Sequence, residues 1–265
     1  HSGHRSTLDR HFRWARVAGL TGFVVSWWGR ESFEDRQVLK IHKTAAKFGL
    51  QICLYYERIP DSSHTTRESM ILADFKYLSR QYANHPAYYK RDGKSVLFLY
   101  DRAIKSLKPL SRWDKIVSQS SFLLIADGTT HTRSTIFHGT HTYNPVSVLT
   151  NIPNPNTSES RSEVVTRLHL HYRHSAKTQR HHGQPVILSV AKGYDDRLER
   201  PETGFYLSSN NNRMYHTMWL NALAFQPDIV LITSWNEWHE GTEIEPSREE
   251  GEMWLTLTRL YTTME

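Results

Sequence analysis

Two glutamates near the C-terminal end of the chain have the spacing of an acid–base pair. Glu237 and Glu240 stand three residues apart in the segment Trp235-Asn-Glu-Trp-His-Glu-Gly-Thr-Glu-Ile-Glu245. This segment follows the apolar, β-branched run 229–233, which is typical of a buried parallel strand. In a turn after a strand, two carboxylates at this spacing can converge on one small volume. Their like charges then push the two pKa values apart, so that one group can serve as an acid and the other as a base.

The residues that flank this pair favour a carbohydrate as the ligand. Trp235, Asn236, Trp238 and His239 lie within the same short segment. Indole faces can stack on the C–H faces of a sugar, while its hydroxyl groups need hydrogen-bond acceptors. An acidic surface loop around a buried tryptophan is the alternative, but solvated loops seldom hold two tryptophans.

Composition bounds the class of protein. A chain of 265 residues is long enough for one large core, and its 8 Trp and 13 Tyr are many. The net charge of +6 raises the possibility of nucleic-acid binding, but the basic residues are scattered and no aromatic residues interleave with them. We therefore favour a solvated basic surface and expect no nucleic-acid partner. Cys53 is the single cysteine, so neither an intrachain disulfide nor a cysteine metal site is possible.

The ends of the chain carry no evident targeting segment. No apolar run is long enough to span a membrane, and His1-Ser-Gly-His4 is not a signal peptide. Because the chain does not begin with Met, we expect a processed or trimmed catalytic domain. We also expect the protein to be a monomer. Removal of a targeting segment would favour a secreted, periplasmic or secretory-pathway location, although the sequence does not determine the compartment.

Strand-like and helix-like segments alternate along the chain. The expected helices cover residues 6–18, 34–48, 66–83, 109–119, 160–181, 213–225 and 252–264. The expected strands cover residues 22–26, 50–56, 95–100, 122–126, 135–143, 185–190 and 229–234. Seven strands in βα units predict one (β/α)8 barrel over residues 1–265, with the first strand missing or atypical because the chain opens on a helix. A doubly wound open sheet is the alternative, but no glycine-rich phosphate loop follows any strand.

Acidic or aromatic residues follow the C-terminal end of each expected strand. They are Trp27, Trp28, Glu57, Asp101, Asp127, Tyr143, Tyr194, Asp195, Glu237 and Glu240. In a barrel these ends converge on one face, where active sites are built. Asp127, which precedes Gly128, could equally cap the next helix. Beside the catalytic pair, the candidate substrate-binding residues are Trp27, Trp28, Glu57, Asp101, Tyr143, Tyr194, Trp235, Asn236 and His239.

The segment 235–245 resembles the signature of glycoside hydrolase family 99, the endo-α-mannosidases and endo-α-mannanases. Further likenesses occur in the same order as in the family, at Ser26-Trp27-Trp28, Asn84-His-Pro-Ala-Tyr-Tyr89, Tyr100-Asp101, Thr142-Tyr143, Ser189-Val190 and Gly193-Tyr194-Asp195. The resemblance implies a metal-free and cofactor-free (β/α)8 enzyme that cleaves internal α-mannosidic bonds with retention.

The resemblance also implies a mechanism and roles for four residues. The glutamate that matches Glu237 deprotonates the 2-hydroxyl of the substrate, which attacks the anomeric carbon to give a 1,2-anhydro sugar. The glutamate that matches Glu240 protonates the leaving oxygen and then activates water. This differs from the carboxylate nucleophile of most retaining glycosidases. Glu57 matches a carboxylate that binds the sugar at the cleavage site, and Trp28 matches an aromatic residue that shapes the next subsite.

The chain departs from the family pattern in two places. The family's His-x-Glu-Pro-Tyr is Tyr55-Tyr-Glu-Arg-Ile59 here, and its first strand with an aromatic loop has no match. A related group of barrels, described as polysaccharide-biosynthesis proteins, carries a similar Trp-Asn-Glu-Trp motif, so another polysaccharide is an alternative substrate. A carbohydrate-binding barrel without catalysis is a second alternative.

Histidines offer two weaker alternatives. His171 and His174 could share a helical face and bind a metal, but no carboxylate or cysteine is close in sequence. His239-Glu240 is similar to part of a zinc-protease motif, but position 243 is glutamate rather than histidine. We therefore expect no metal.

Overall fold

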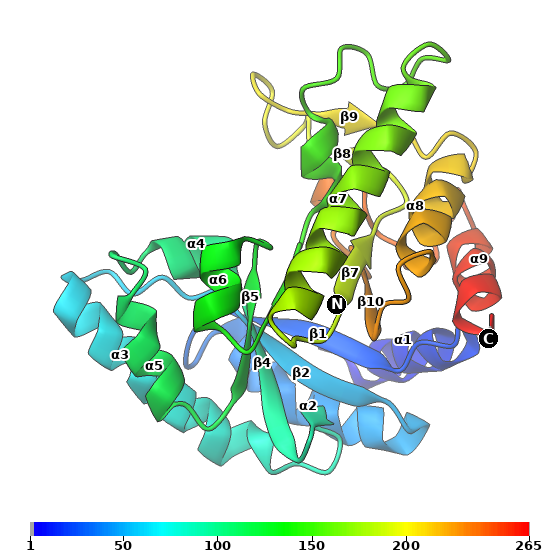
Figure 1. Cartoon of the computed structure of the whole chain (residues 1–265). Coiled ribbons are helices and arrows are strands. Elements are labelled where there is room, and N and C mark those ends of the chain that lie inside the picture. The colour runs from blue at the N-terminus through cyan, green and yellow to red at the C-terminus, as the bar shows by residue number, and fades with distance from the viewer. Residues whose placement is uncertain (1–2, 265) are drawn as a thin grey trace. The chain divides into compact units, whose positions relative to one another are not determined.

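The structure is a computed structural model that describes residues 3–264, and the chain forms two compact units (Figure 1). Unit 1 comprises His1–Asp127, Thr132–Gly139 and Thr258–Glu265, and unit 2 comprises Gly128–His131 and Thr140–Leu257. Each unit is described by itself below. The organisation as one domain over residues 1–265 stays a prediction.

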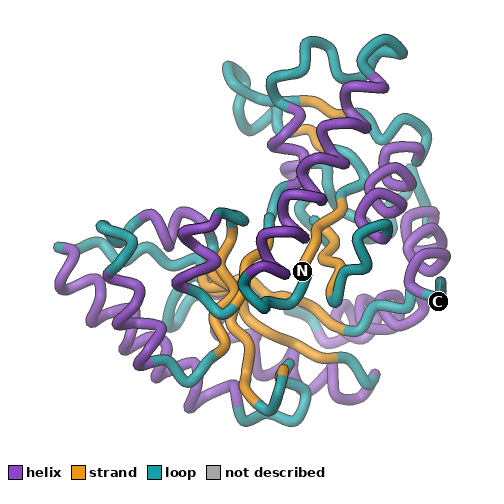
Figure 2. The backbone as a smooth tube through the Cα atoms, viewed as in Figure 1, coloured by secondary structure: helices purple, strands orange, loops and turns teal. Residues whose placement is uncertain are grey.

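A parallel sheet forms the centre of unit 1. Its strands run side by side in the order β1 (Gly22–Trp27), β2 (Gln51–Tyr56), β4 (Lys94–Leu99) and β5 (Leu123–Asp127) (Figure 2). The register pairs Val24 with Cys53, and Leu54 with Leu97. The short strand β3 (Lys90–Arg91) pairs antiparallel with β4. Every residue of β2 after Gln51 is buried, as expected for an apolar strand inside a parallel sheet.

Helices cover this sheet. They are α1 (Arg5–Val17), α2 (Phe33–Phe48), α3 (His64–Leu78), the π-helical turn η1 (Ser79–Ala83), α4 (Asp101–Lys105), α5 (Arg112–Gln119) and α6 (His131–Ile136). The contacts place α2 on β1 and β2, α1 on α2, and α3 beside α5. Local signals fix the ends of α2, because the Ser32 hydroxyl accepts the Asp35 N–H at 3.1 Å and Gly49 adopts a left-handed conformation after the last turn.

A buried carboxylate joins β1, α2 and α3 in unit 1. Asp35 accepts hydrogen bonds from the Trp27 indole at 2.7 Å, from the Tyr77 hydroxyl at 2.8 Å and from the Tyr82 hydroxyl at 2.7 Å. The Glu31 N–H also donates to it, at 2.9 Å. Burial raises the pKa of Asp35, but these four hydrogen bonds together hold it below its ordinary value.

Unit 2 is built around a pair of parallel strands, β7 (Ile187–Val190) and β10 (Ile229–Ile232). Its other elements are η2 (Pro145–Leu149), α7 (Arg161–His181), β8 (Tyr194–Asp195), β9 (Tyr206–Leu207), α8 (Arg213–Leu223) and η3 (Trp238–Glu240). Both α7 and α8 pack on β7, beside which Figure 1 shows them, and β8 pairs antiparallel with β9. The strand β6 (Gly139–His141) and the helix α9 (Met253–Thr262) lie where the chain passes between the units.

Most of the predicted elements are present within a few residues of their expected ends. The prediction of a strand over 135–143 is wrong, because α6 ends at Ile136 and β6 covers only Gly139–His141. Thr135 and Ile136 are β-branched, which made the segment look like a strand. In unit 1 the buried Arg133 side chain donates to the Asp127 carbonyl and pairs with Asp101, and these contacts hold the segment as a helical turn. In the described residues, α1 precedes β1 as expected. No helix in residues 3–264 has both the length and the apolar character that crossing a bilayer requires.

Candidate active site

The predicted site residues divide between the two units. Unit 2 holds the catalytic pair with Tyr143, Tyr194, Trp235, Asn236 and His239, and unit 1 holds Trp27, Trp28, Glu57 and Asp101.

The loop that carries the two glutamates is fixed by hydrogen bonds of its own backbone. After β10, the Ser234 hydroxyl accepts the Glu237 N–H at 2.9 Å and contacts the Thr242 hydroxyl at 2.8 Å. The Ser234 N–H donates to the Thr242 carbonyl at 3.0 Å, so the two ends of the loop are tied together. The turn η3 occupies the interval, and Glu237 and Glu240 stand at its two ends. A loop held in this way presents its side chains in a fixed geometry, as catalysis requires.

Gly241 closes this loop in a left-handed conformation, with φ of +60°. A Cβ atom at this position would lie 3.3 Å from the Asp195 Cβ atom, so the backbone of the loop packs closely on β8. Glycine suits the position on both counts, because it avoids the strain of positive φ and leaves room for β8.

Glu240 lies among two phenols and a guanidinium. Its Oε2 atom accepts a hydrogen bond from the Tyr143 hydroxyl at 3.2 Å. Its Oε1 atom lies 3.4 Å from the Tyr194 hydroxyl and 3.9 Å from Nη2 of Arg200. Burial, followed by the negative charge of Glu237, raises the pKa of Glu240, whereas Tyr143, Arg200 and Tyr194 lower it and only partly offset the rise.

A carboxyl group with a raised pKa can hold a proton at a pH where an ordinary glutamate is ionised. Glu240 therefore suits the role of a general acid. Glu237 is half-buried and supplies part of the negative charge that Glu240 experiences.

The residues around the pair differ in exposure. Trp238 is 48% exposed, and its indole N–H donates to Glu245 at 3.2 Å. Asn236 and His239 are exposed, and the His239 ring lies 3.2 Å from the Glu199 carboxylate. Trp235 is half-buried, and its carbonyl accepts the Glu245 N–H at 2.9 Å, which makes it part of the loop framework.

Trp27 and Trp28 are adjacent in unit 1 but have opposite environments. Trp28 is 51% exposed, so its ring is available for stacking. Trp27 has no exposed surface, donates to Asp35 and stacks on Tyr56 with the ring centroids 5.6 Å apart. We therefore assign Trp27 a packing role rather than sugar contact.

The two acidic residues of unit 1 also differ. Glu57 directly follows β2, and its side chain is buried, with the residue 8% exposed. Asp101 lies at the start of α4 and pairs with Lys105 and Arg133, each at 2.6 Å. Burial raises the pKa of Asp101, but these two cations outweigh burial and lower it. Asp101 therefore forms ion pairs within its own unit, at the start of a helix.

Sequence reasoning missed two groups of charged residues in unit 2. The first is Asp196 and Arg200, which lie on the turn between β8 and β9 beside Tyr194 and Glu240. The second is Lys192, whose ammonium group lies 2.8 Å from the carboxylates of Glu243 and Glu250. The charges around Gly193-Tyr194-Asp195 were the available signal, but the sequence does not show which of them pair.

No group of three His, Cys, Asp or Glu side chains within residues 3–264 has an arrangement that could hold a metal ion. Desolvation lowers the pKa of His171 to about 4, with a smaller contribution from His174.

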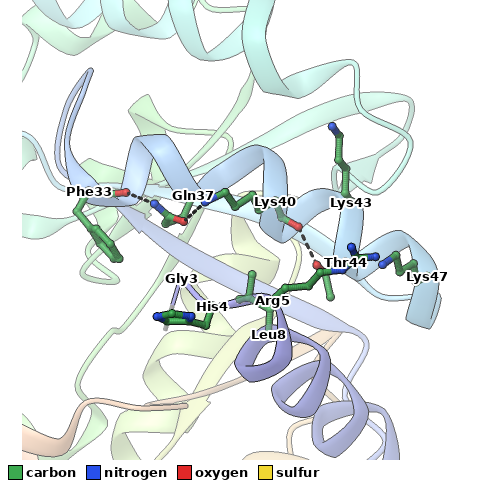
Figure 3. Close-up of a pocket in the computed structure, with 10 residues that line it drawn as sticks. All are labelled: Gly3, His4, Arg5, Leu8, Phe33, Gln37, Lys40, Lys43, Thr44 and Lys47. Atoms are coloured by element: carbon green, nitrogen blue, oxygen red, sulfur yellow. Dashed lines mark hydrogen bonds between the residues drawn. The ribbon is translucent and has the colours of Figure 1, made fainter. Parts of the chain in front are cut away.

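None of the predicted site residues lines the pocket shown in Figure 3. Its volume is about 830 Å³, and it lies in unit 1 between the start of α1 and one side of α2. Gln37, Lys40 and Thr44, which point along it, are joined by hydrogen bonds that follow α2 itself (Figure 3). We assign it no ligand.

Relatives and solved structures with a similar sequence or fold agree with the resemblance noted in the sequence. The chain is 25% identical over 267 residues to the glycoprotein endo-alpha-1,2-mannosidase of Mus musculus, and the match covers 91% of this chain and 53% of that protein. It is also 25% identical over 282 residues to the glycoprotein endo-alpha-1,2-mannosidase-like protein of Homo sapiens, with coverage of 96% and 56%. The chain thus spans about half the length of these relatives.

The fold is similar to that of the GH99 endo-alpha-mannosidase from Bacteroides thetaiotaomicron. The TM-score is 0.79 at 24% sequence identity, and the match covers 98% of this chain and 79% of that structure. This likeness confirms the predicted fold class, an α/β barrel. The sequence profile of glycosyl hydrolase family 99 matches residues 1–144 and 160–252, and the chain therefore belongs to glycosyl hydrolase family 99.

Proposed function

We propose that this chain is a retaining, endo-acting glycosidase that cleaves α-mannosidic bonds in mannan or N-glycan-type oligosaccharides. The observation that carries the proposal is the environment of Glu240, whose pKa is raised by burial and by Glu237 while the Tyr143 hydroxyl orients its carboxyl group. A carboxyl group with a raised pKa and a second carboxyl group on the same loop can supply the acid and the base that glycoside cleavage requires.

The proposed reaction has two steps, and each glutamate carries protons in both. In the first step Glu237 accepts the proton of the substrate's 2-hydroxyl, and O2 attacks the anomeric carbon. The glycosidic C1–O bond breaks while Glu240 donates its proton to the leaving oxygen, which leaves a 1,2-anhydro sugar and a carboxylate at Glu240. In the second step Glu240 accepts a proton from water, whose oxygen attacks the anomeric carbon. The C1–O2 bond of the anhydro sugar breaks, and Glu237 returns its proton to O2.

The stereochemistry of mannose supports this route. The axial 2-hydroxyl of an α-mannoside lies trans to the axial leaving group, so O2 can attack from the opposite face. Two successive inversions at the anomeric carbon give net retention. In this scheme Glu237 acts as a base and does not become covalently bound.

We also propose sugar-binding roles for two residues of unit 1. A buried carboxylate such as Glu57 can accept hydrogen bonds from sugar hydroxyls in a poorly solvated environment, where these bonds are strong. The half-exposed ring of Trp28 offers a face for stacking. Of the indoles in unit 2, Trp238 is the one whose exposure suits the same role.

The test is incubation of the protein with an α-mannan and with a glucosylated mannose oligosaccharide, with the products separated by chromatography. Release of a disaccharide or a larger fragment is the expected result. Glu240→Gln should lower the rate by orders of magnitude on natural glycans and by less on substrates with activated leaving groups, which need no protonation. Glu237→Gln should abolish turnover of both kinds of substrate.

Glu163→Gln is the matched control, because Glu163 pairs with Arg167 on an exposed part of α7. It should leave the rate unchanged. Wild-type turnover by Glu240→Gln or Glu237→Gln would refute the assigned roles. Glycan binding without any turnover by the wild-type protein would instead identify a carbohydrate-binding barrel.

A further inference from the structure

The turn between β8 and β9 in unit 2 is organised around a buried aspartate. Asp196 is 4% exposed, and its Oδ1 atom accepts the Phe205 N–H at 2.7 Å. Its carbonyl accepts the Arg200 N–H at 2.8 Å, and its Oδ2 atom accepts the Arg200 guanidinium. One side chain therefore fixes both the backbone of the turn and the direction of the Arg200 side chain.

Gly204 shows how closely this turn is packed. A Cβ atom at this position would lie 2.6 Å from the Arg197 Cα atom and 2.6 Å from the Arg200 carbonyl oxygen. Both neighbours are backbone atoms, so a side chain here would displace the turn. The position of Arg200 is thus determined by the local fold and by Asp196 together.

Arg200 is directed at Glu240 on its other side. Its Nη1 atom donates to the Tyr194 hydroxyl at 3.1 Å, and its Nη2 atom lies 3.9 Å from Oε1 of Glu240. The Tyr194 hydroxyl lies nearer to Asp196, at 2.9 Å, than to Glu240, at 3.4 Å. A hydroxyl has one proton to donate, and the shorter contact with Asp196 favours that acceptor. Arg200 is therefore the group that presents positive charge to Oε1.

Among residues 3–264, four charged or titratable groups have the main effects on Glu240. They are Tyr143 after β6, Tyr194 on β8, Arg200 on the β8–β9 turn and Glu237 at the start of η3. Glu237 and Arg200 carry opposite charges and have opposite effects. Glu237 disfavours the carboxylate form of Glu240, and Arg200 favours it. Without a nearby cation, a buried carboxyl beside another carboxylate would release its proton reluctantly.

We propose that Arg200, fixed by Asp196, is a positioning residue for Glu240 that stabilises its carboxylate form and so lets the group alternate between acid and base. This inference rests on the proposed function, in which Glu240 donates a proton in one step and accepts one in the next. The same guanidinium orients Oε1 while Tyr143 holds Oε2.

The test measures the titration of Glu240 directly, by ¹³C NMR of protein labelled at the glutamate side-chain carboxyl carbons. The resonance is assigned by its loss in Glu240→Gln. In Arg200→Gln the midpoint of the Glu240 titration should move to higher pH, and in Arg200→Lys it should move less, because a positive charge remains. Arg197→Gln is the control, since Arg197 lies on the same turn but pairs with Asp195 at 2.8 Å. That variant should titrate like the wild type.

An unchanged midpoint in folded Arg200→Gln would overturn the proposal, as would an equal shift in Arg197→Gln. Arg200→Met, which keeps an aliphatic stem, replaces the glutamine variant if the latter does not fold. The pH profile of kcat/KM provides the second readout, and its basic limb should move to higher pH in Arg200→Gln. Failure of the proposed function can be distinguished from failure of this inference. If the wild-type protein is inactive, the NMR titration still tests whether Arg200 stabilises the carboxylate form of Glu240.

Discussion

The hydroxyl of Tyr143 donates a hydrogen bond of 3.2 Å to Oε2 of Glu240, across 97 positions of the sequence. This bond stabilises the carboxylate form and is one of the contacts that lower the pKa of Glu240. Tyr143→Phe should therefore raise the pKa of Glu240 further and move the basic limb of the kcat/KM profile to higher pH. Tyr206→Phe, in the exposed part of β9, is the control. A profile unchanged in Tyr143→Phe would mean that Glu240 does not set the basic limb.

Glu240→Gln should stabilise the fold at alkaline pH. Burial and Glu237 raise the folded-state pKa of Glu240 above its ordinary value of 4.5. The stabilising contribution of the protonated group is then fully present below pH 4.5 and is lost as the pH rises through the folded-state pKa. Removing the charge should therefore raise Tm at pH 8. Differential scanning calorimetry at pH 8 and pH 4 measures the difference, which should shrink at the lower pH.

Asp35→Ala should strongly destabilise the protein. The substitution removes the carboxylate that accepts from the Trp27 indole and from the Tyr77 and Tyr82 hydroxyls. The Trp27 indole loses this acceptor, whereas the Tyr82 hydroxyl can still donate to the backbone carbonyl of residue 35 and the Tyr77 hydroxyl to the Tyr82 hydroxyl. Each buried donor left unsatisfied costs about 1–3 kcal/mol. Urea unfolding at pH 7 measures the loss, with Asp9→Ala on α1 as the control.

The same carboxylate should contribute to acid unfolding. Because the folded-state pKa of Asp35 is depressed, its contribution is present above the ordinary value of 3.8 and is lost as the pH falls through the folded-state pKa. The stability difference between wild type and Asp35→Ala should therefore narrow below pH 3.8. A difference that stays constant down to pH 2 would contradict this assignment.

Lys192→Met should destabilise the protein by about 3–5 kcal/mol, the usual cost of removing one partner of a buried ion pair. The Lys192 side chain is 7% exposed and that of Glu243 is 9% exposed, so the carboxylate would stay buried without its cation. Adding Glu243→Gln to Lys192→Met should restore part of the loss. Chemical denaturation of the single and double variants measures both effects. A double variant no more stable than Lys192→Met would contradict the expected relief of the buried Glu243 charge.

Glu57→Gln should lower kcat/KM by about 10–100-fold, because a hydrogen bond to a charged group contributes about 1.5–3 kcal/mol. With a natural glycan as the substrate, the loss in Glu57→Gln should be larger than that in Glu163→Gln, which serves again as the surface control. Steady-state kinetics with a defined mannose oligosaccharide measures it, and a variant with wild-type kcat/KM would remove Glu57 from the substrate-binding residues.

The strand and turn around Glu237 and Glu240 could be predicted from the sequence because their determinants are local. An apolar strand that ends in a run of aromatic and acidic residues is visible in a short window, and the spacing of Glu237 and Glu240 lies within one turn. The parallel strands were equally visible, since strands buried on both faces read as continuous apolar runs.

Residues that depend on distant partners were harder to assign. Trp27 and Trp28 are the same residue type at adjacent positions, yet successive side chains at a strand end point in opposite directions. The hydrogen-bond partner of the buried Trp27 indole is Asp35 on α2, which the local sequence does not identify. Arg200 reaches Glu240 across 40 positions, through a turn that Asp196 organises. No periodicity or local motif encodes such a pairing, which forms only when the chain folds.

The turn between β8 and β9 carries residues that affect the pKa of Glu240 but does not carry Glu240 itself. The two carboxyl groups proposed to react, Glu237 and Glu240, belong to the loop after β10, whereas Arg200 beside Glu240 and the Asp196 that holds it belong to a different segment. Substitutions in that turn can alter the pH range of the protein without any change in the signature segment. Divergence of pH optimum among proteins that share this signature is therefore expected to concentrate in the β8–β9 turn, which also makes it the first place to vary when the pH range is to be engineered.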